Sequence, residues 1–371
     1  MRFHGKFRLI ATALLAAILF SVFTLFAFSE EPIRVSAKGA ALYSPDTKSF
    51  LYEKNGDVRS PMASTTKIMT ALVAAEAGDL TERIRIPKEA VGIEGSSLYL
   101  REGESFTLEE LLYGLMLRSA NDAATAIALT VSGSISAFAE KMNEKAASLG
   151  LNDTNFENPH GLDSENHYTT AKDLARLGAA AIENETVRTI ASTYKKIIGE
   201  GESARLIVNH NKLLRSYDGA IGLKTGFTKK CGRCLVGAAE REGVTLVSAT
   251  LSAPDDWTDH REMLDYGFSM LRSYIHLAPE ESTHKISVLG GKNSTVQVAN
   301  KEGFSLVERA GLADVSMRVC LNPYATAPIR KGDVLGQLLF IRNGEVLGTI
   351  PLLAKTDIAA IESKRRRFFF F

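Results

Sequence analysis

The chain has 371 residues, of which 45% are hydrophobic and 23% charged, an ordinary globular composition with enough length for more than one core. Its formal net charge of +1 gives no electrostatic case for nucleic acid or for a strongly acidic partner. Three cysteines are too few for a disulfide scaffold in an exported protein of this size. We therefore expect two folded domains and no nucleic-acid partner.

The first thirty residues differ from the rest. Arg2, Lys6 and Arg8 precede an uncharged run at residues 9–28, which ends in Ala27-Phe28-Ser29. The small residues favour cleavage near Ser29, whereas an apolar length of about 20 residues also suffices to span a bilayer. Residues 1–29 are therefore predicted to be a signal peptide or an N-terminal membrane anchor, and the remainder to work outside the cytoplasmic membrane.

A serine and a lysine begin the first predicted helix. Residues 41–43 and 50–52 flank a Ser44-Pro45-Asp46 turn and predict a hairpin before it. Ser64-Thr65-Thr66-Lys67 then opens an apolar-periodic run that ends near Gly78, which places Ser64 and Lys67 on one helix face. A lysine can activate a serine only where its surroundings lower the lysine pKa. The pair is a candidate nucleophile and base, and a solvated first turn is the alternative.

A polar break separates the next two predicted helices. Thr107 and Glu110 form a capping box before a buried stripe at residues 108–116, and a second helical run follows at residues 123–131. In the segment between them, Ser119 and Asn121 alternate in direction, so both side chains can enter one cleft. The alternative is that Asn121 or Asp122 caps the second helix.

Helices at residues 135–149 and from Thr170 onward pack the core, and the polar loop between them contains His160. Histidine in such a loop is more often a structural hydrogen-bonding group than a catalytic one. Strands at residues 221–227, 234–239 and 244–251 predict the centre of a sheet. Lys224-Thr225-Gly226 on the first of them can present a charge, a hydroxyl and backbone N–H groups to a carboxylate.

Cys231 and Cys234 are spaced as a redox pair or as half of a metal site. No second cysteine pair and no histidine cluster completes a zinc set, and the surrounding residues read as a strand. Packing residues or an incidental disulfide are the alternative interpretation. Cys320 is predicted to be a core residue. No metal and no cofactor is expected.

Ser64-x-x-Lys67, Ser119-x-Asn121 and Lys224-Thr225-Gly226 occur in this order, on a helix start, an inter-helix loop and an inner strand. They resemble the motif set of penicillin-binding proteins and serine β-lactamases. The surrounding residues, including Asn158-Pro159-His160-Gly161-Leu162, are similar to the low-molecular-mass penicillin-binding proteins that are D-alanyl-D-alanine carboxypeptidases. The likeness covers residues 33–272, and residues 284–357 are similar to the small all-β domain that follows in this family.

The resemblance implies an α+β fold. A β-lactamase/transpeptidase-like catalytic domain at residues 33–275, with a central antiparallel sheet flanked by helices, would precede an all-β domain at residues 282–358. Strands there are predicted at residues 286–289, 295–298, 316–321 and 338–341, and Asn343-Gly344 predicts a two-residue hairpin. The basic and aromatic tail, residues 359–371, would rest on an anionic cytoplasmic membrane surface or be a frayed end.

The resemblance also implies a mechanism on a peptidoglycan stem peptide, with β-lactams as inhibitors. Ser64 would attack the D-Ala-D-Ala carbonyl and Lys67 would take its proton. Ser119 would relay a proton to the leaving group, and Asn121 would bind a substrate amide. The Lys224-Thr225-Gly226 strand would hold the terminal carboxylate through Lys224 and Thr225, and backbone N–H groups of Ser64 and Phe227 would hold the oxyanion.

Two other functions fit the same motifs. A β-lactam hydrolase would need an element for fast deacylation, and no Glu-x-x-Leu-Asn stretch occurs at residues 152–167. A non-hydrolytic wall-binding or penicillin-sensing protein would keep the fold without using Ser64. Some relatives use an arginine before the last catalytic-domain helix for the carboxylate, but residues 254–261 place Arg261 differently, so it is not assigned to the site.

Overall fold

The computed structural model describes residues 33–361. The chain divides into two units, Met1–Val35 and Ser36–Phe371, and all features below belong to the second unit. The predicted signal or anchor segment and the end of the tail lie outside the described residues. Within the described part, no single helix is long and apolar enough to cross a membrane; the consecutive helices Asn121–Ser132 and Ile135–Ser148 meet that criterion only as a pair bent by 85°.

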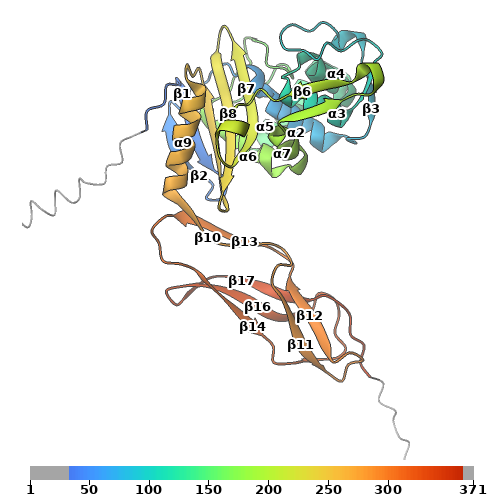
Figure 1. Ribbon diagram of the computed structural model, residues 1–371, viewed down its shortest axis with the longest axis vertical. Helices are drawn as coiled ribbons and strands as arrows, with labels where there is room; N and C mark the ends of the chain where they lie inside the picture. The colour runs from blue at the N-terminus through green and yellow to red at the C-terminus, as the bar shows by residue number, and fades with distance from the viewer. Residues whose placement is uncertain (1–32, 362–371) are drawn as a thin grey trace, which may run out of the picture. The chain divides into compact units, whose positions relative to one another are not determined.

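A five-stranded antiparallel sheet forms the centre of the catalytic region (Figure 1). The predicted hairpin is its first two strands, and the three apolar strands predicted later in the chain complete it. In spatial order, the strands are β2 (Ser49–Lys54), β1 (Gly39–Ser44), β9 (Val244–Leu251), β8 (Gly232–Arg241) and β7 (Ala220–Thr228).

The prediction that Lys224 lies on an inner strand is wrong. β7 pairs with β8 on one side only and is the edge of the sheet. Its apolar residues are buried because helices cover it, not because strands flank it on both sides. An edge strand keeps free backbone N–H and C=O groups, which can pair with another extended peptide.

Two helices cover opposite faces of this sheet. In α6 (Ala171–Glu183), Gly178 lies against Val236 and Val247, whereas in α9 (Asp256–Met270), Gly267 lies against Leu42 and Leu246. Adjacent strand residues such as Leu246 and Val247 point to opposite faces, so the helices must lie on opposite sides. Figure 1 shows α9 in front of β1 and most of the other helices beside the sheet.

The remaining helices form a group next to β7. They are α2 (Lys67–Ala77), α3 (Leu108–Leu117), α4 (Asn121–Ser132), α5 (Ile135–Ser148) and α7 (Glu185–Ser192), with the short helices η1 (Ala63–Thr66), η2 (Lys88–Ala90), η3 (Gly201–Ser203) and α8 (Leu213–Ser216). Two short hairpins accompany them: β3 (Arg83–Arg85) with β4 (Ser105–Thr107), and β5 (Lys195–Ile198) with β6 (Arg205–Val208). One buried hydrophobic cluster joins these helices to the sheet.

The polar break between α3 and α4 is shorter than predicted. The Thr107–Glu110 capping box is present at the start of α3. However, α4 begins at Asn121, and its N-cap is Ala120, which makes no side-chain capping bond. The alternative of an Asn121 or Asp122 cap is therefore wrong, because both side chains are used for tertiary contacts. Ser119 has a φ of 61°, a left-handed conformation that is costly for a non-glycine residue.

The C-terminal part is all-β, as predicted. A six-stranded sheet has the order β14-β16-β17-β12-β11-β15, and β10 pairs with β13. The strands are β10 (Leu271–Leu277), β11 (Thr283–Leu289), β12 (Thr295–Asn300), β13 (Phe304–Arg309), β14 (Ser316–Leu321), β15 (Ala325–Thr326), β16 (Val334–Arg342) and β17 (Glu345–Ala354). Their own hydrophobic cluster includes Leu338 and Phe340.

Local predictions in this part were mostly confirmed. The strand predicted at residues 316–321 coincides with β14, and Asn343 and Gly344 have φ values of 52° and 85°, as a two-residue hairpin turn requires. Cys320 is a correction, since it is half-buried on the edge strand β14 and does not belong to the core. The exact bounds proposed for the two domains remain a prediction.

Candidate active site

Lys67 is at the centre of the site. It is fully buried at the start of α2, one turn after Ser64. Its Nζ lies 3.0 Å from Ser64 Oγ, 2.7 Å from Asn121 Oδ1 and 2.5 Å from the carbonyl oxygen of His160. Three segments that are far apart in the sequence therefore meet at one amine.

These contacts suit a neutral lysine. The Asn121 Oδ1 and the His160 carbonyl can only accept, so they take two N–H bonds, and the remaining position of Nζ faces a hydroxyl that can donate. The Asn121 amide cannot be reversed, because its Nδ2 donates to the Glu94 carbonyl at 2.5 Å. Burial, helped by the charge of Lys224, lowers the pKa of Lys67 well below its usual value. Nζ is thus arranged to accept the proton of Ser64.

The short helix η1, which carries Ser64, is held in place by the contacts of Thr66. Thr66 Oγ1 donates to the Ala63 carbonyl at 2.8 Å and lies 2.7 Å from His167 Nε2. His167 Nδ1 accepts from the Glu157 N–H at 3.0 Å, so its proton is on Nε2 and faces Thr66. Burial lowers the pKa of His167 to about 4, which keeps it neutral. Nothing in the sequence singled out His167.

Gly161 explains part of the motif at residues 158–162. It has a φ of 88°, and a Cβ there would lie 2.0 Å from the Ala63 carbonyl oxygen. Its N–H donates to Asn158 Oδ1 at 2.7 Å. His160 contributes its backbone carbonyl to Lys67, and its Nδ1 accepts from the Leu162 N–H. The structural interpretation of His160 therefore holds, and the loop supports the Ser64 segment from one side.

Asp122 organises the opposite loop. Its buried carboxylate accepts from the backbone N–H groups of Leu98 and Leu100 and from Ser97 Oγ. The backbone N–H of Asn121 also donates to the Ser96 carbonyl at 2.7 Å. These bonds attach residues 96–100 to the start of α4, next to Ser119. The sequence predicts a loop at Gly95-Ser96-Ser97 but carries no signal that attaches it to the site.

The edge strand β7 closes the site on the side of Ser64. A Cβ on Gly226 would lie 3.1 Å from the Ser64 backbone nitrogen, so glycine lets the strand approach this closely without displacing the Ser64 segment. Lys224 is 1% exposed, and its Nζ donates to the Thr225 carbonyl at 2.8 Å. Burial lowers the pKa of Lys224 to about 7. Phe227, by contrast, is 66% exposed.

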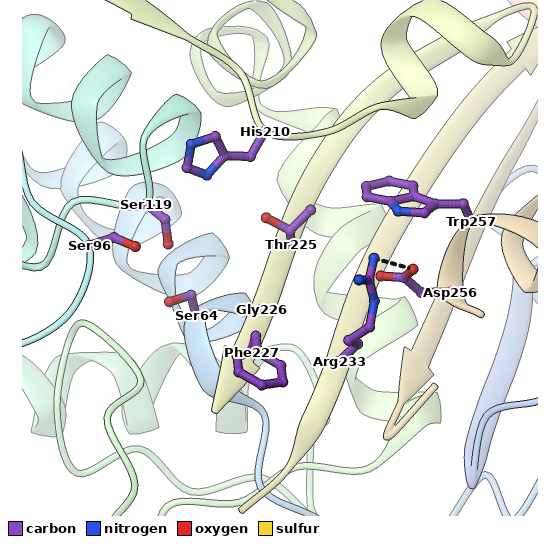
Figure 2. Close-up of a pocket in the computed structure, with 10 residues that line it drawn as sticks. All are labelled: Ser64, Ser96, Ser119, His210, Thr225, Gly226, Phe227, Arg233, Asp256 and Trp257. Atoms are coloured by element: carbon purple, nitrogen blue, oxygen red, sulfur yellow. Dashed lines mark hydrogen bonds and ion pairs between the residues drawn. The ribbon is translucent and has the colours of Figure 1, made fainter. Parts of the chain in front are cut away.

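A cavity of about 480 Å³ opens above these groups. Of the predicted site residues, Ser64, Ser119, Thr225, Gly226 and Phe227 line it, whereas Lys67, Asn121 and Lys224 are buried beneath its floor. Figure 2 shows Ser64 and Ser119 on one side of Thr225, with a second group of side chains on the other. The remaining lining residues are Ser96, His210, Arg233, Asp256 and Trp257.

The second group was not predicted. Arg233 was given no role in the sequence analysis, where it lay between two cysteines. It is paired directly with Phe227 across β7 and β8. Asp256 and Trp257 begin α9. Arg261, which the sequence interpretation left out of the site, is exposed on α9 and does not line the cavity. Strand alternation could have placed Arg233 beside Phe227 once the pairing of β7 with β8 was known.

Cys231 and Cys234 are free thiols with sulfur atoms 3.9 Å apart. The Cys234 side chain has 0% exposure and Cys231 5%, so both are packing residues in the reduced state described. Hydrogen bonding from Cys234 lowers the pKa of Cys231 to about 6. Within residues 33–361, no group of three or more histidine, cysteine or carboxylate side chains is arranged to hold a metal ion.

Comparison with known proteins decides the family. The family model described as D-alanyl-D-alanine carboxypeptidase matches residues 26–255, and that of the penicillin-binding protein 5 C-terminal domain matches residues 276–360. This chain belongs to the D-alanyl-D-alanine carboxypeptidase family. The resemblance drawn from the three motifs is confirmed, and with it the assignment to serine-type peptidases among the low-molecular-mass penicillin-binding proteins.

Individual relatives agree with the family match over most of their length. The chain is 33% identical to the D-alanyl-D-alanine carboxypeptidase DacF of Bacillus subtilis, covering 95% of this chain and 94% of DacF. It is 31% identical to DacC of Escherichia coli, covering 87% and 84%. Penicillin-binding protein 5 of Haemophilus influenzae has a similar structure, with a TM-score of 0.64, 26% identity and coverage of 88% and 99%. The predicted fold class is confirmed.

Proposed function

We propose that this protein is a serine-type D-alanyl-D-alanine carboxypeptidase that removes the terminal D-alanine from peptidoglycan stem peptides. The observation that carries the proposal is the contact, at 3.0 Å, of Ser64 Oγ with the buried Lys67 amine, whose pKa burial lowers well below its usual value. A hydroxyl next to a neutral amine can lose its proton while it attacks a carbonyl carbon.

The first half of the reaction forms an acyl-enzyme. Ser64 Oγ bonds to the carbonyl carbon of the penultimate D-alanine as its proton passes to Lys67 Nζ. The C–N bond then breaks, and the proton held on Lys67 Nζ passes through Ser119 to the leaving nitrogen, so D-alanine departs with a neutral amine and its carboxylate. Asn121 orients Lys67 through its Oδ1, and the resemblance to the family implies that it also bonds a substrate amide.

The second half releases the shortened peptide. A water molecule attacks the ester carbonyl and gives up a proton, the ester C–O bond breaks, and Ser64 recovers its hydrogen. In both halves, backbone N–H groups of Ser64 and Phe227 would hold the oxyanion, since Gly226 brings β7 against the Ser64 backbone. Thr225 would bond the terminal carboxylate, and Lys224 would stabilise it by charge from beneath the strand.

The substrate and inhibitor classes follow from this assignment. A β-lactam presents a strained amide and a carboxylate to the same groups, so it would acylate Ser64. Because stem peptides lie outside the cytoplasmic membrane, the protein would act there, either secreted or held on the membrane by its N-terminal segment. The tail would add a contact with the membrane surface.

The test is an intact-mass measurement after incubation with benzylpenicillin, followed by peptide mapping, for the wild-type protein and Ser64→Ala. We expect one penicilloyl adduct on the peptide that contains Ser64 and none on the variant. In parallel, the wild type should release D-alanine from a stem pentapeptide faster than it turns over a chromogenic β-lactam. D-Alanine release by Ser64→Ala at the wild-type rate would refute the nucleophile, and fast β-lactam turnover would favour a β-lactamase.

A further inference from the structure

The cavity is lined by a cationic side chain that the proposed mechanism leaves unused. Among the described residues that line it, Arg233 is the only lysine or arginine. Lys224 is buried, does not line the cavity and donates a hydrogen bond to the Thr225 carbonyl. An anionic group that enters the cavity therefore meets Arg233 directly, whereas Lys224 acts on it mainly through its charge.

Arg233 is held in place by a buried carboxylate. Its Nη2 donates to Asp256 Oδ1 at 2.7 Å, and the Asp256 side chain is 4% exposed while that of Arg233 is 44% exposed. The guanidinium also lies 6.0 Å from the ring centroid of Trp257. A guanidinium has five N–H groups, so one bond to Asp256 leaves others for a ligand.

The strand register aims Arg233 at the correct part of the cavity. Arg233 lies directly opposite Phe227 in the β7–β8 pair, and Thr225 is two residues before Phe227 on the same face. A diagonal neighbour of this kind is within reach of a long side chain. In Figure 2, the Arg233 guanidinium and the Thr225 side chain both border the open space next to Ser64 and Ser119.

We propose that Arg233 binds the C-terminal carboxylate of the substrate together with the Thr225 hydroxyl, and that Asp256 is a positioning residue that orients the guanidinium. The inference rests on the proposed carboxypeptidase function and names how that function selects a free chain end. A planar guanidinium can bond a carboxylate through two N–H groups, which favours a terminal carboxylate over an internal amide.

The test compares two peptides that differ only at the chain end: diacetyl-L-lysyl-D-alanyl-D-alanine and its C-terminal amide. We expect the wild type to prefer the free acid. Arg233→Met should lower kcat/KM for the acid about 10- to 100-fold, the value of a charged hydrogen bond, and leave the amide unchanged. Arg233→Lys should recover part of the preference for the acid, because it restores the positive charge but not the planar pair of N–H donors.

Two further variants separate binding from folding. Arg233→Met leaves the Asp256 carboxylate buried without its partner, so the double variant Arg233→Met/Asp256→Asn is measured as well. The double variant should lose the preference for the free acid to the same extent and keep the thermal stability of the wild type. Asp256→Asn alone should raise KM for the acid more than it changes kcat. Arg241→Met is the matched control, since Arg241 is on the same strand, pairs with Asp265 and lies outside the cavity.

The outcomes are distinct. If the wild type releases no D-alanine from the free acid, the proposed function fails and this inference fails with it. If the wild type is active and selective but Arg233→Met keeps the full preference for the acid, only the role of Arg233 is refuted. An equal loss for the acid and the amide would also refute it, because a carboxylate-binding residue must act on the acid alone.

Discussion

At the scale of single residues, the proposed mechanism gives opposite tasks to two buried lysines within one site. Lys67 must be neutral to accept a proton, and its amine faces two obligate acceptors and one hydroxyl. Lys224 must be charged to stabilise a carboxylate, although burial lowers its pKa to about 7. Each charge disfavours the other, so protonation of Lys224 helps to keep Lys67 deprotonated.

This pairing predicts a bell-shaped pH dependence of kcat/KM for D-alanine release. The rate should fall at low pH as Lys67 gains a proton, and fall again above about pH 7 as Lys224 loses its proton. Lys224→Arg keeps the charge at all working pH values, so its alkaline limb should shift upward or vanish even if its maximum rate is lower. Initial rates between pH 5 and 10 would measure both limbs. An alkaline limb that is identical in Lys224→Arg would assign it to another group.

At the scale of elements, the site depends on how closely β7 and the loop at residues 158–162 approach the Ser64 segment. Both approaches are made by glycines: a Cβ on Gly161 would collide with the Ala63 carbonyl, and one on Gly226 would make a tight contact with the Ser64 backbone nitrogen. Ala63 has a φ of 46° and Ser119 a φ of 61°, so the two segments that present the serines are strained. Packing from the neighbouring elements must hold these conformations.

Gly161→Ala tests this support. The new Cβ would lie 2.0 Å from the Ala63 carbonyl oxygen and displace the Ser64 segment, so acylation by a fluorescent penicillin should slow by about 100-fold, as expected for a displacement near 1 Å. Gly133→Ala is the control, because Gly133 also has a positive φ, 75°, but has open space around it. It should cost stability only. Equal acylation rates in the two variants would contradict the proposed support.

At the scale of the whole molecule, the fold is built around histidines that must stay neutral. His260 is fully buried between the Ser248 and Thr250 hydroxyls, at 2.7 Å and 2.9 Å, and burial lowers its pKa to about 3. His167 has a pKa lowered to about 4 by burial. The unfolded chain binds these protons near pH 6.5 and the folded chain does not, so the stability they contribute is present above pH 6.5 and is lost as the pH falls toward 4.

His160 adds to these two, because burial lowers its pKa to about 3. We expect the free energy of unfolding to fall by roughly 5 kcal/mol between pH 6.5 and pH 5, because each histidine contributes up to about 1.4 kcal/mol per pH unit. Urea unfolding at several pH values would measure the slope. His260→Gln keeps hydrogen-bonding groups between the two hydroxyls without a titrating ring, so about a third of the slope should disappear. A slope that stays the same in this variant would exclude His260 as a source.

The elements that carry the chemistry were predictable from local signals. The apolar periodicity, the capping box at Thr107 and the Asn343-Gly344 turn each act within a few residues, so α2, α3 and the β16–β17 hairpin followed from them. The order of the three polar motifs was sufficient to predict the family, which the comparisons confirmed. The assignment of Ser64, Lys67, Ser119 and the binding residues to roles remains a prediction.

What the sequence determined by itself was the set of elements and the polar motifs they carry, because hydrogen bonding and apolar spacing within one element are local. The tertiary structure alone decided that β7 is an edge strand, that His167 supports Thr66, and that Arg233 on β8 lines the cavity. The first two facts depend on strand order and on packing between residues far apart in the sequence, and the third depends on the register of the β7–β8 hairpin. The pairing of Phe227 with Arg233 across two strands has no counterpart in the spacing of either motif.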